Sequence, residues 1–485
     1  MNRMLKLAMA AVIALVSGGA YAQVTGKTVL GTNANQWDPA LAPYAGTPQA
    51  TAEKGTFHAG GVAACDGCHV MHNASNGVAR STKVAPWTNA VPAFLLQGTD
   101  QSSTCLICHG DSVAGGTAKP YVITNTGTDV TQFNFSPGGD FGWVRTPFTN
   151  SPATNHGHSV AAADFGFTSE PRVAPGGTYA GGASGTSQFA CSSCHDPHGR
   201  YRIEGDATWK WTGPTGTGLP PITQPIWSSG SYGNAPRTDG AIGAYRLLAG
   251  QGYVPASSLA SPFPFPNNPP VAVAPTNYNK SEAGSGLVRT NEVRVAYGSG
   301  MSEWCQNCHT NIHLDSYVSG AMGSSGLRHP AGQGAVLKPG QFDVYNKYIS
   351  SGSFDAAGTR DLYTSLVPFE SAAKVAYTGT GGTNLGTTLG ALKGAATGTD
   401  TAGIFVASAQ SNVMCLSCHR AHASAFSSMV RWNPDDTFIT DASTTTFVDT
   451  QGRGNPALVA GYYGRTPADF GLFQRSLCNK CHGKD

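Results

Sequence analysis

Six short cysteine motifs constrain this chain of 485 residues more than any other feature. All twelve cysteines occur in C-x-x-C pairs, and a histidine follows each pair directly. The pairs are Cys65/Cys68, Cys105/Cys108, Cys191/Cys194, Cys305/Cys308, Cys415/Cys418 and Cys478/Cys481, followed by His69, His109, His195, His309, His419 and His482. They are numbered motifs 1 to 6 in chain order below.

Paired cysteines serve three kinds of chemistry. An even number of cysteines in an exported chain can form disulfides, and C-x-x-C can be half of a zinc site. Neither use requires a histidine directly after the second cysteine. Covalent haem attachment does, because both thiols bond one porphyrin and the adjacent imidazole binds its iron. The sequence therefore predicts six haems c, bound through the twelve cysteines, with the six motif histidines as proximal iron ligands.

Each haem iron has a second axial position. The remaining histidines are His58, His72, His156, His158, His198, His313, His329 and His422. Methionine is the alternative ligand, and Met301, Met322, Met414 and Met429 lie near the motifs in sequence. The supply of histidines favours bis-histidine haems throughout, which implies low potentials, no open iron and no catalytic residues.

Four of these histidines follow a proximal histidine closely. His72, His198 and His422 come three residues after one, and His313 comes four residues after His309. A side chain so near in sequence lies beside the proximal ligand and cannot reach the opposite face of the same haem. Each is either a surface or propionate-bonding histidine or, as we predict, a ligand to a neighbouring haem. Shared segments would bring haems close together, and since electron tunnelling falls exponentially with distance, a contiguous row would conduct electrons.

The composition predicts a fold that is mostly coil with short helices and few strands. Glycine (62) and proline (30) are frequent, and charged residues make up 12% of the chain, against ~25% in typical domains. Successive motifs are 40, 86, 114, 110 and 63 residues apart, so there is no fixed repeat. We expect the stacked haems to form the core of a single domain over residues 57–485.

The N-terminal region predicts export. Residues 1–22 have the features of a signal peptide, with Arg3 and Lys6 before an apolar stretch and a small-residue cleavage site at Ala20-Tyr21-Ala22. Residues 23–56 form a low-complexity N-terminal arm. We expect no transmembrane segment after signal removal, and the absence of a basic cluster argues against nucleic-acid binding. The mature chain is expected to be secreted through the periplasm to the outer cell surface.

Several stretches resemble a known family. They include "FHAGGVAACDGCHVMHN", "PGGDFGWV", "CSSCHDPHGRYR", "LRHPAGQGA" and "YYGRTPADFGLFQRSLCNKCH". These stretches are similar to the six-haem outer-surface c-type cytochromes that form extracellular nanowires in metal-reducing bacteria. The resemblance implies a coil-rich fold, bis-histidine haems in alternating parallel and T-shaped pairs, and a head-to-tail filament.

The resemblance also implies particular axial ligands. Seven histidines match those of the family, of which six are needed: His58, His72, His158, His198, His313, His329 and His422. His156 has no counterpart. The histidine that matches His72 binds a haem of the next subunit in the family, which here would be the haem of motif 5.

The predicted function is extracellular electron transfer along the six haems to iron oxides or other acceptors, in a filament of copies of this chain, with other multihaem cytochromes as further partners. The protein is expected not to be an enzyme. The alternatives are a monomeric periplasmic or outer-surface electron shuttle and, with less support, a multihaem oxyanion reductase, which would need a haem with an open position.

Overall fold

The structure of the protein is a computed structural model. It describes residues 68–69, 74–75, 78–79, 95–110, 121–124, 128–167, 189–197, 202–205, 211–215, 226–228, 241–243, 248–255, 264–270, 272–273, 296–297, 299–309, 331–332, 335–351, 367–371, 398–399, 405–442, 445–470 and 472–476.

Several predicted features lie outside the described residues. They are the signal peptide, the arm, Cys65, the whole of motif 6 (Cys478, Cys481 and His482) and the candidate ligands His58, His72, His198, His313 and His329. In motif 2 the backbone of Cys108 is described as part of a helix, but its side chain is not. The predicted bond between Cys108 and a haem therefore stays a prediction, as do the roles of the other residues in this set.

The helices are short. The α-helices are α2 (Gln101–His109), α4 (Met301–Cys305), α5 (Pro339–Ser351), α7 (Cys415–Cys418), α8 (Asn455–Gly461) and α9 (Pro467–Phe470). The 3-10 helices are η6 (Val130–Gln132), η7 (Phe141–Arg145), η8 (Ala153–Asn155), η9 (Ala163–Phe165), η10 (Cys191–Ser193) and η15 (Ser427–Met429). Aspartates cap several of the described helices; for example, Asp100 accepts a hydrogen bond from the N–H of Ser103 in α2, and Asp140 accepts one from the N–H of Gly142 in η7.

The strands in the described part of the chain are also short and form four small sheets. They are β1 (Ala74–Ser75), β2 (Val78–Ala79), β3 (Arg202–Gly205), β4 (Trp211–Thr215), β5 (Ile226–Ser228), β6 (Ala241–Gly243), β7 (Ala272–Val273), β8 (Ala296–Tyr297), β9 (Glu370–Ser371), β10 (Gly398–Thr399), β11 (Phe405–Val406) and β12 (Ser411–Asn412). Two sheets have four strands, in the orders β4-β3-β6-β5 and β12-β9-β8-β7, and two are antiparallel pairs, β1-β2 and β10-β11. The prediction of a coil-rich fold with short helices and few strands is confirmed.

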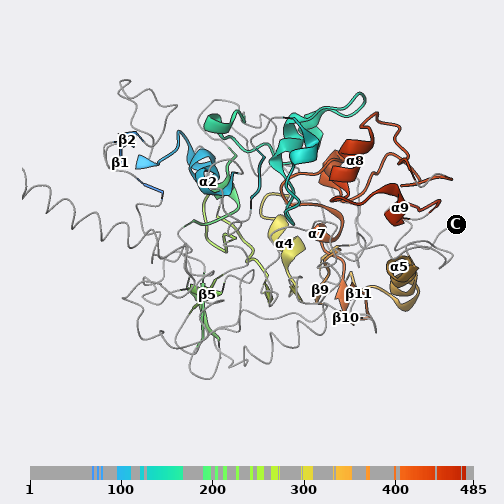
Figure 1. Cartoon of the computed structure of the whole chain (residues 1–485). Helices are drawn as coiled ribbons and strands as arrows, with labels where there is room; N and C mark the ends of the chain where they lie inside the picture. The colour runs from blue at the N-terminus through green and yellow to red at the C-terminus, as the bar shows by residue number, and fades with distance from the viewer. Residues whose placement is uncertain are drawn as a thin grey trace, which may run out of the picture.

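The helices are spread across the molecule. In Figure 1, α2 lies on one side, α4 and α7 lie near the middle, and α8 and α9 lie on the opposite side. No helix among the described residues combines the length and the apolar character that a membrane crossing requires.

The apolar core is divided into separate clusters, several of which flank a motif helix. Leu106 of α2 packs with Phe141 and Val160. A second cluster joins Met301 of α4 and Met414, the residue before α7, to Leu248 and Tyr297. The largest cluster among the described residues is rich in aromatic residues and joins segments from Phe133 to Phe470; among its members are Trp143, Phe426, Trp432, Tyr462, Tyr463 and Phe470. Met301 and Met414, two of the alternative ligands, are buried and thus pack in apolar surroundings.

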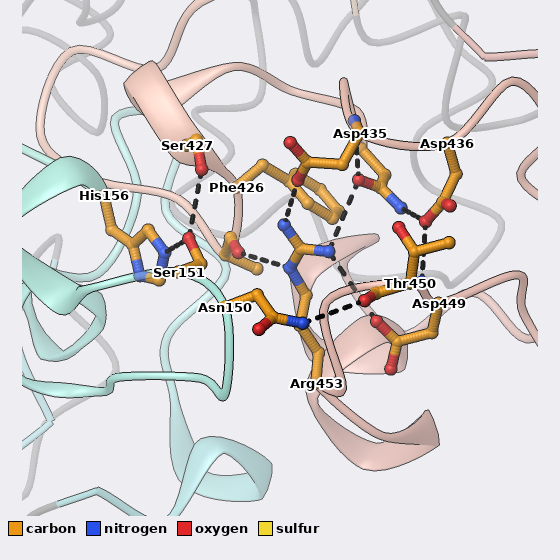
Figure 2. Close-up of polar contacts among 12 residues, drawn as sticks. Asn150, Ser151, His156, Phe426, Ser427, Asp435, Asp436, Asp449, Thr450 and Arg453 are labelled. Carbon is orange, nitrogen blue, oxygen red and sulfur yellow. Dashed lines mark hydrogen bonds and ion pairs between the residues drawn. The ribbon is translucent and has the colours of Figure 1, made fainter.

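A buried arginine holds the C-terminal region together (Figure 2). Nη2 of Arg453 lies 2.6 Å from a carboxylate oxygen of Asp435, and Nη1 lies 3.7 Å from one of Asp449. Nε donates to the carbonyl oxygen of Ala425 at 3.2 Å. The guanidinium also lies over the ring of Phe426, 5.4 Å from its centre. One side chain therefore compensates two acidic groups and caps an aromatic residue of the core.

Removing this arginine is expected to destabilise the fold. Arg453→Met should lower the free energy of unfolding by about 3 kcal/mol, because two partly buried carboxylates lose their counter-charge. The free energy is measured by guanidinium unfolding followed by tryptophan fluorescence. Lys338→Met, the same type of change at an exposed position, should alter it by less than about 0.5 kcal/mol. Equal effects of the two changes would contradict the role of Arg453.

Candidate haem-attachment sites

Motifs 2 to 5 each form a single helical turn. Motif 2 lies at the end of α2, and in motifs 3 to 5 the histidine N–H donates to the carbonyl of the first cysteine. The N–O distances are 2.9 Å for His195 and Cys191, 3.0 Å for His309 and Cys305, and 2.9 Å for His419 and Cys415. Residues three apart on a helix share a face, so in motifs 3 to 5 this turn aims both cysteines in one direction with the histidine beside them. That arrangement is the one that haem attachment requires.

The two other uses of paired cysteines are not found among the described residues. The eight cysteines with described side chains are those of motifs 3 to 5 together with Cys68 and Cys105; they form no disulfide, and no cluster of three or more metal-ligating side chains occurs in that part of the chain. Burial raises the pKa of Cys194 strongly and that of Cys308 to about 12. A zinc site needs thiolates, so these surroundings disfavour it.

A backbone connection that we call the strap crosses motifs 1, 3 and 5. In each, the N–H of a residue distant in sequence donates to the carbonyl of the second cysteine: Gln97 to Cys68 at 2.8 Å, Ala249 to Cys194 at 2.9 Å, and Arg431 to Cys418 at 2.8 Å. The motif histidine also forms an isolated antiparallel bridge with the residue before that donor, in the pairs His69–Leu96, His195–Leu248 and His419–Val430. The strap fixes the backbone that carries each proximal histidine.

Motif 4 is held by side chains instead. The amide nitrogen of Asn307 donates to the carbonyl of Asn267 at 3.1 Å, and its amide oxygen accepts from the N–H of Asn267 at 2.9 Å. Motifs 1, 3 and 5 therefore share a mode of attachment to the fold that differs from the mode of motif 4.

The motifs follow one another in space in their sequence order. The pKa of Cys105 is raised first by a hydrogen bond with Cys191, then by burial, and also by the nearby Cys68. That of Cys194 is raised by burial and then by Cys308. That of Cys305 is raised first by a hydrogen bond with Cys415 and, among smaller causes, by Cys194. These neighbours connect motifs 1, 2, 3, 4 and 5 in that order.

Two predicted distal histidines face proximal histidines of other motifs. The ring centres of His158 and His309 are 6.1 Å apart, and those of His422 and His195 are 6.4 Å apart. Metal–imidazole bonds of about 2 Å place the ring centres of two opposed ligands roughly 6 Å apart. The spacing of both pairs therefore fits one iron between two imidazoles.

Backbone carbonyl groups and phenylalanine rings orient several of the motif and distal histidines. Nδ1 of His158 lies 2.8 Å from the carbonyl oxygen of Ala421, and Nδ1 of His419 lies 2.7 Å from that of Ser428. A proton on Nδ1, donated to the carbonyl, leaves Nε2 as the metal-binding nitrogen. Phenylalanines stack on the distal rings, Phe189 on His158 and Phe141 on His422.

The distal segments are also joined through their backbones. The N–H of His158 donates to the carbonyl of His422 at 3.0 Å, and the N–H of His422 donates to that of Gly138 at 2.8 Å. A Cβ at Gly138 would lie 2.7 Å from Nδ1 of His422, and one at Gly139, which has φ +94°, would lie 1.7 Å from the carbonyl oxygen of Ala423. The two glycines therefore permit the close approach that positions His422.

His156 has different surroundings. It is fully buried, its Nε2 lies 2.9 Å from the hydroxyl of Ser151 (Figure 2), and its Nδ1 lies 3.3 Å from the carbonyl oxygen of Trp143. Burial lowers its pKa to about 4. Both ring nitrogens are thus used in structural contacts.

The helical C-x-x-C-H turns and the opposed imidazoles are the features of a multihaem c-type cytochrome. No family model matches the chain. C-type cytochrome OmcS of Geobacter sulfurreducens is 42% identical over 453 residues, which cover 88% of this chain and 94% of that protein. Two solved structures, of the outer membrane cytochrome S filament and of OmcS nanowires, both from Geobacter sulfurreducens, are 41% identical, cover 88% of this chain and all of theirs, and have TM-scores of 0.67 and 0.69.

The chain therefore belongs to the OmcS family of c-type cytochromes, as the sequence resemblance predicted. It is an electron-transfer cytochrome whose cofactor is haem c. When bound, this cofactor supplies a reversible one-electron change at iron. The sequence motifs did not predict the straps or the two glycines beside His422, although the glycine pair lies in "PGGDFGWV", one of the stretches that carried the resemblance.

A buried glutamate fixes the start of the motif 4 helix. Oε2 of Glu370, in β9, accepts from the N–H groups of Gly300 and Met301, both at 3.1 Å, and Oε1 accepts from the side chain of Asn412 at 3.1 Å. Burial, and after it the charge of Glu303, raises the pKa of Glu370 to about 8. The carboxyl group is therefore mainly protonated at neutral pH in the folded protein.

Glu370 should make stability depend on pH. Its pKa is higher in the folded state than its usual value of 4.5, so unfolding releases a proton between those two values. The free energy of unfolding should then fall by about 1.4 kcal/mol per pH unit from about pH 5 to 8. Glu370→Gln removes this contribution, and denaturant unfolding across that range should show the variant gaining stability relative to the unaltered chain as pH rises. Parallel pH profiles for the two chains would refute the assignment.

Proposed function

We propose that this protein carries electrons outside the cell along a row of six bis-histidine haems c, and that copies of the chain join head to tail into a conductive filament. The observation that carries the proposal is the spatial order of the motifs, in which each of motifs 1 to 5 lies next to its sequence neighbour. Sites in such an order pass electrons by short successive steps. The chain acts as a carrier without a catalytic iron.

The axial ligands follow from the opposed rings. His158 is the distal ligand at the site of His309 in motif 4, and His422 is the distal ligand at the site of His195 in motif 3. His422 thus serves motif 3 although it belongs in sequence to motif 5. The other four sites take their distal ligands from His58, His72, His198, His313 and His329, one of which is surplus.

Removing a distal imidazole should open one iron. His422→Ala should convert about one haem in six to the high-spin form, because the site of His195 keeps only its proximal ligand; His158→Ala should do the same at the site of His309. Electron paramagnetic resonance measures the high-spin fraction. His156→Ala removes another histidine of the same region and should leave every haem low-spin. A fully low-spin His422→Ala protein with all six haems would refute the pairing.

Three observations support the filament. The two solved relatives are a filament and nanowires, and this chain covers all of each of them. Large apolar side chains are exposed near both ends of the motif order, with Leu95 beside the strap of motif 1 and Leu472 and Phe473 shortly before motif 6. In Figure 1, α2 and α9, which lie near these ends in sequence, are on opposite sides of the molecule.

Within the filament, His72 binds the motif 5 haem of the next subunit, which keeps the haem row continuous across the interface. Residues 1–22 direct export and are removed, residues 23–56 form an arm, and residues 57–485 form the single haem-binding domain. The filament lies at the outer cell surface and passes electrons to iron oxides and to other multihaem cytochromes.

The inter-subunit ligand gives a direct test. His72→Ala should abolish filaments in electron micrographs of sheared surface material, while mass spectrometry still finds six haems per chain, because only a bond between subunits is lost. Asn73→Ala changes the adjacent residue and should leave filaments intact. Filaments formed by the His72→Ala chain would disprove the inter-subunit bond. A monodisperse species of ~50 kDa from the unaltered chain in sedimentation would instead support an electron shuttle.

A further inference from the structure

The same hydrogen bond joins motif 2 to motif 3 and motif 4 to motif 5. The hydroxyl oxygen of Ser102 accepts from the N–H of Cys191 at 3.1 Å, and that of Ser302 accepts from the N–H of Cys415 at 3.1 Å. Each serine lies three residues before the first cysteine of its own motif. Both are completely buried, with an exposed fraction of 0%. A contact between distant segments thus occurs twice with the same residue types at the same positions.

The segments that receive the serines are also alike. Cys191 is the first residue of η10 and Cys415 is the first residue of α7, and an N–H at a helix start has no acceptor within the helix. The residue before each cysteine donates its N–H to a serine inside the motif, Ala190 to Ser193 at 2.9 Å and Met414 to Ser417 at 3.1 Å. The N–H of the first cysteine is then satisfied by the serine of the preceding motif.

This hydrogen bond lies where the sulfur atoms of neighbouring motifs meet. The serine contact brings the first cysteines of the two motifs together, so that Cys191 neighbours Cys105 and Cys415 neighbours Cys305. A first cysteine in a c-type motif bonds the edge of a porphyrin. Each serine contact would therefore help to set how closely the haems held at these neighbouring cysteines lie when they are bound.

We propose that Ser102 and Ser302 are positioning residues that hold motif 3 against motif 2 and motif 5 against motif 4, and thereby fix the gap that an electron crosses within each pair. The inference rests on the proposed function, since it concerns passage along the row. One site is oxidised as its neighbour is reduced, and no covalent bond changes. The serines bind neither iron nor porphyrin and act through the backbone of the next motif.

Soret circular dichroism tests the role of the serines, because closely coupled haems give a paired positive and negative band that depends on their separation and orientation. Ser102→Ala and Ser302→Ala, made in the full chain, should each reduce the amplitude of this paired band. The losses should add in the double variant, because the two pairs share no partner. Ser102→Thr keeps the hydroxyl and should keep the amplitude.

Ser103→Ala is the matched control. Ser103 is equally buried on the same helix, but its hydroxyl bonds Asp100 and the N–H of Asp164 instead of motif 3. It should keep both the amplitude and six haems. An incomplete haem count in Ser102→Ala, beside a full count in Ser103→Ala and Ser102→Thr, would also support the proposal.

An unchanged paired band in both serine-to-alanine variants with six haems would overturn the proposal, and so would an equal loss in Ser103→Ala. The number of haems per chain, from mass spectrometry, and filament formation are measured separately on the unaltered chain. If the proposed function is wrong, the measurements on the unaltered chain will show it. If only the proposed role of the serines is wrong, the unaltered chain will behave as expected and only the variants will contradict the proposal.

Discussion

The rest of the structure depends on contact between successive C-x-x-C-H turns. The first cysteines of motifs 2 and 3 meet, as do those of motifs 4 and 5, and each meeting point is closed by a buried serine–amide hydrogen bond. An amide buried without an acceptor is costly, so these segments cannot separate without loss. Apolar clusters flank these turns, among them those that contain Leu106, Met301 and Met414.

A second level of order comes from the distal histidines. His422 and His158 are joined by a backbone hydrogen bond, and each faces a proximal histidine of another motif. A change in the position of one would therefore move the other. Position 138 requires glycine because a side chain there would occupy the space of the His422 ring. The pairs of histidine rings are thus held in a fixed relation by a few residues with little regular secondary structure.

Much of this could be predicted from the sequence, and the exceptions have physical reasons. The coil-rich fold followed from frequent glycine and proline and few charges, and the family followed from stretches such as "PGGDFGWV". His156 could be set apart by resemblance, but its hydrogen bonds with Ser151 and Trp143 became visible only in three dimensions. The raised pKa of Glu370 could not be predicted, because it arises from burial and from Glu303, which is remote in the sequence.

The sequence by itself determined the chemistry of attachment. Two thiols and an imidazole must be local to bind one haem, so C-x-x-C-H predicts six sites and their proximal ligands. Only the tertiary structure decided which distal imidazole faces which proximal one, as with His158 and His309, and in which order the motifs touch. Those relations join segments far apart along the chain, and they depend on how the loops pack between the motifs, which no local spacing of residues encodes.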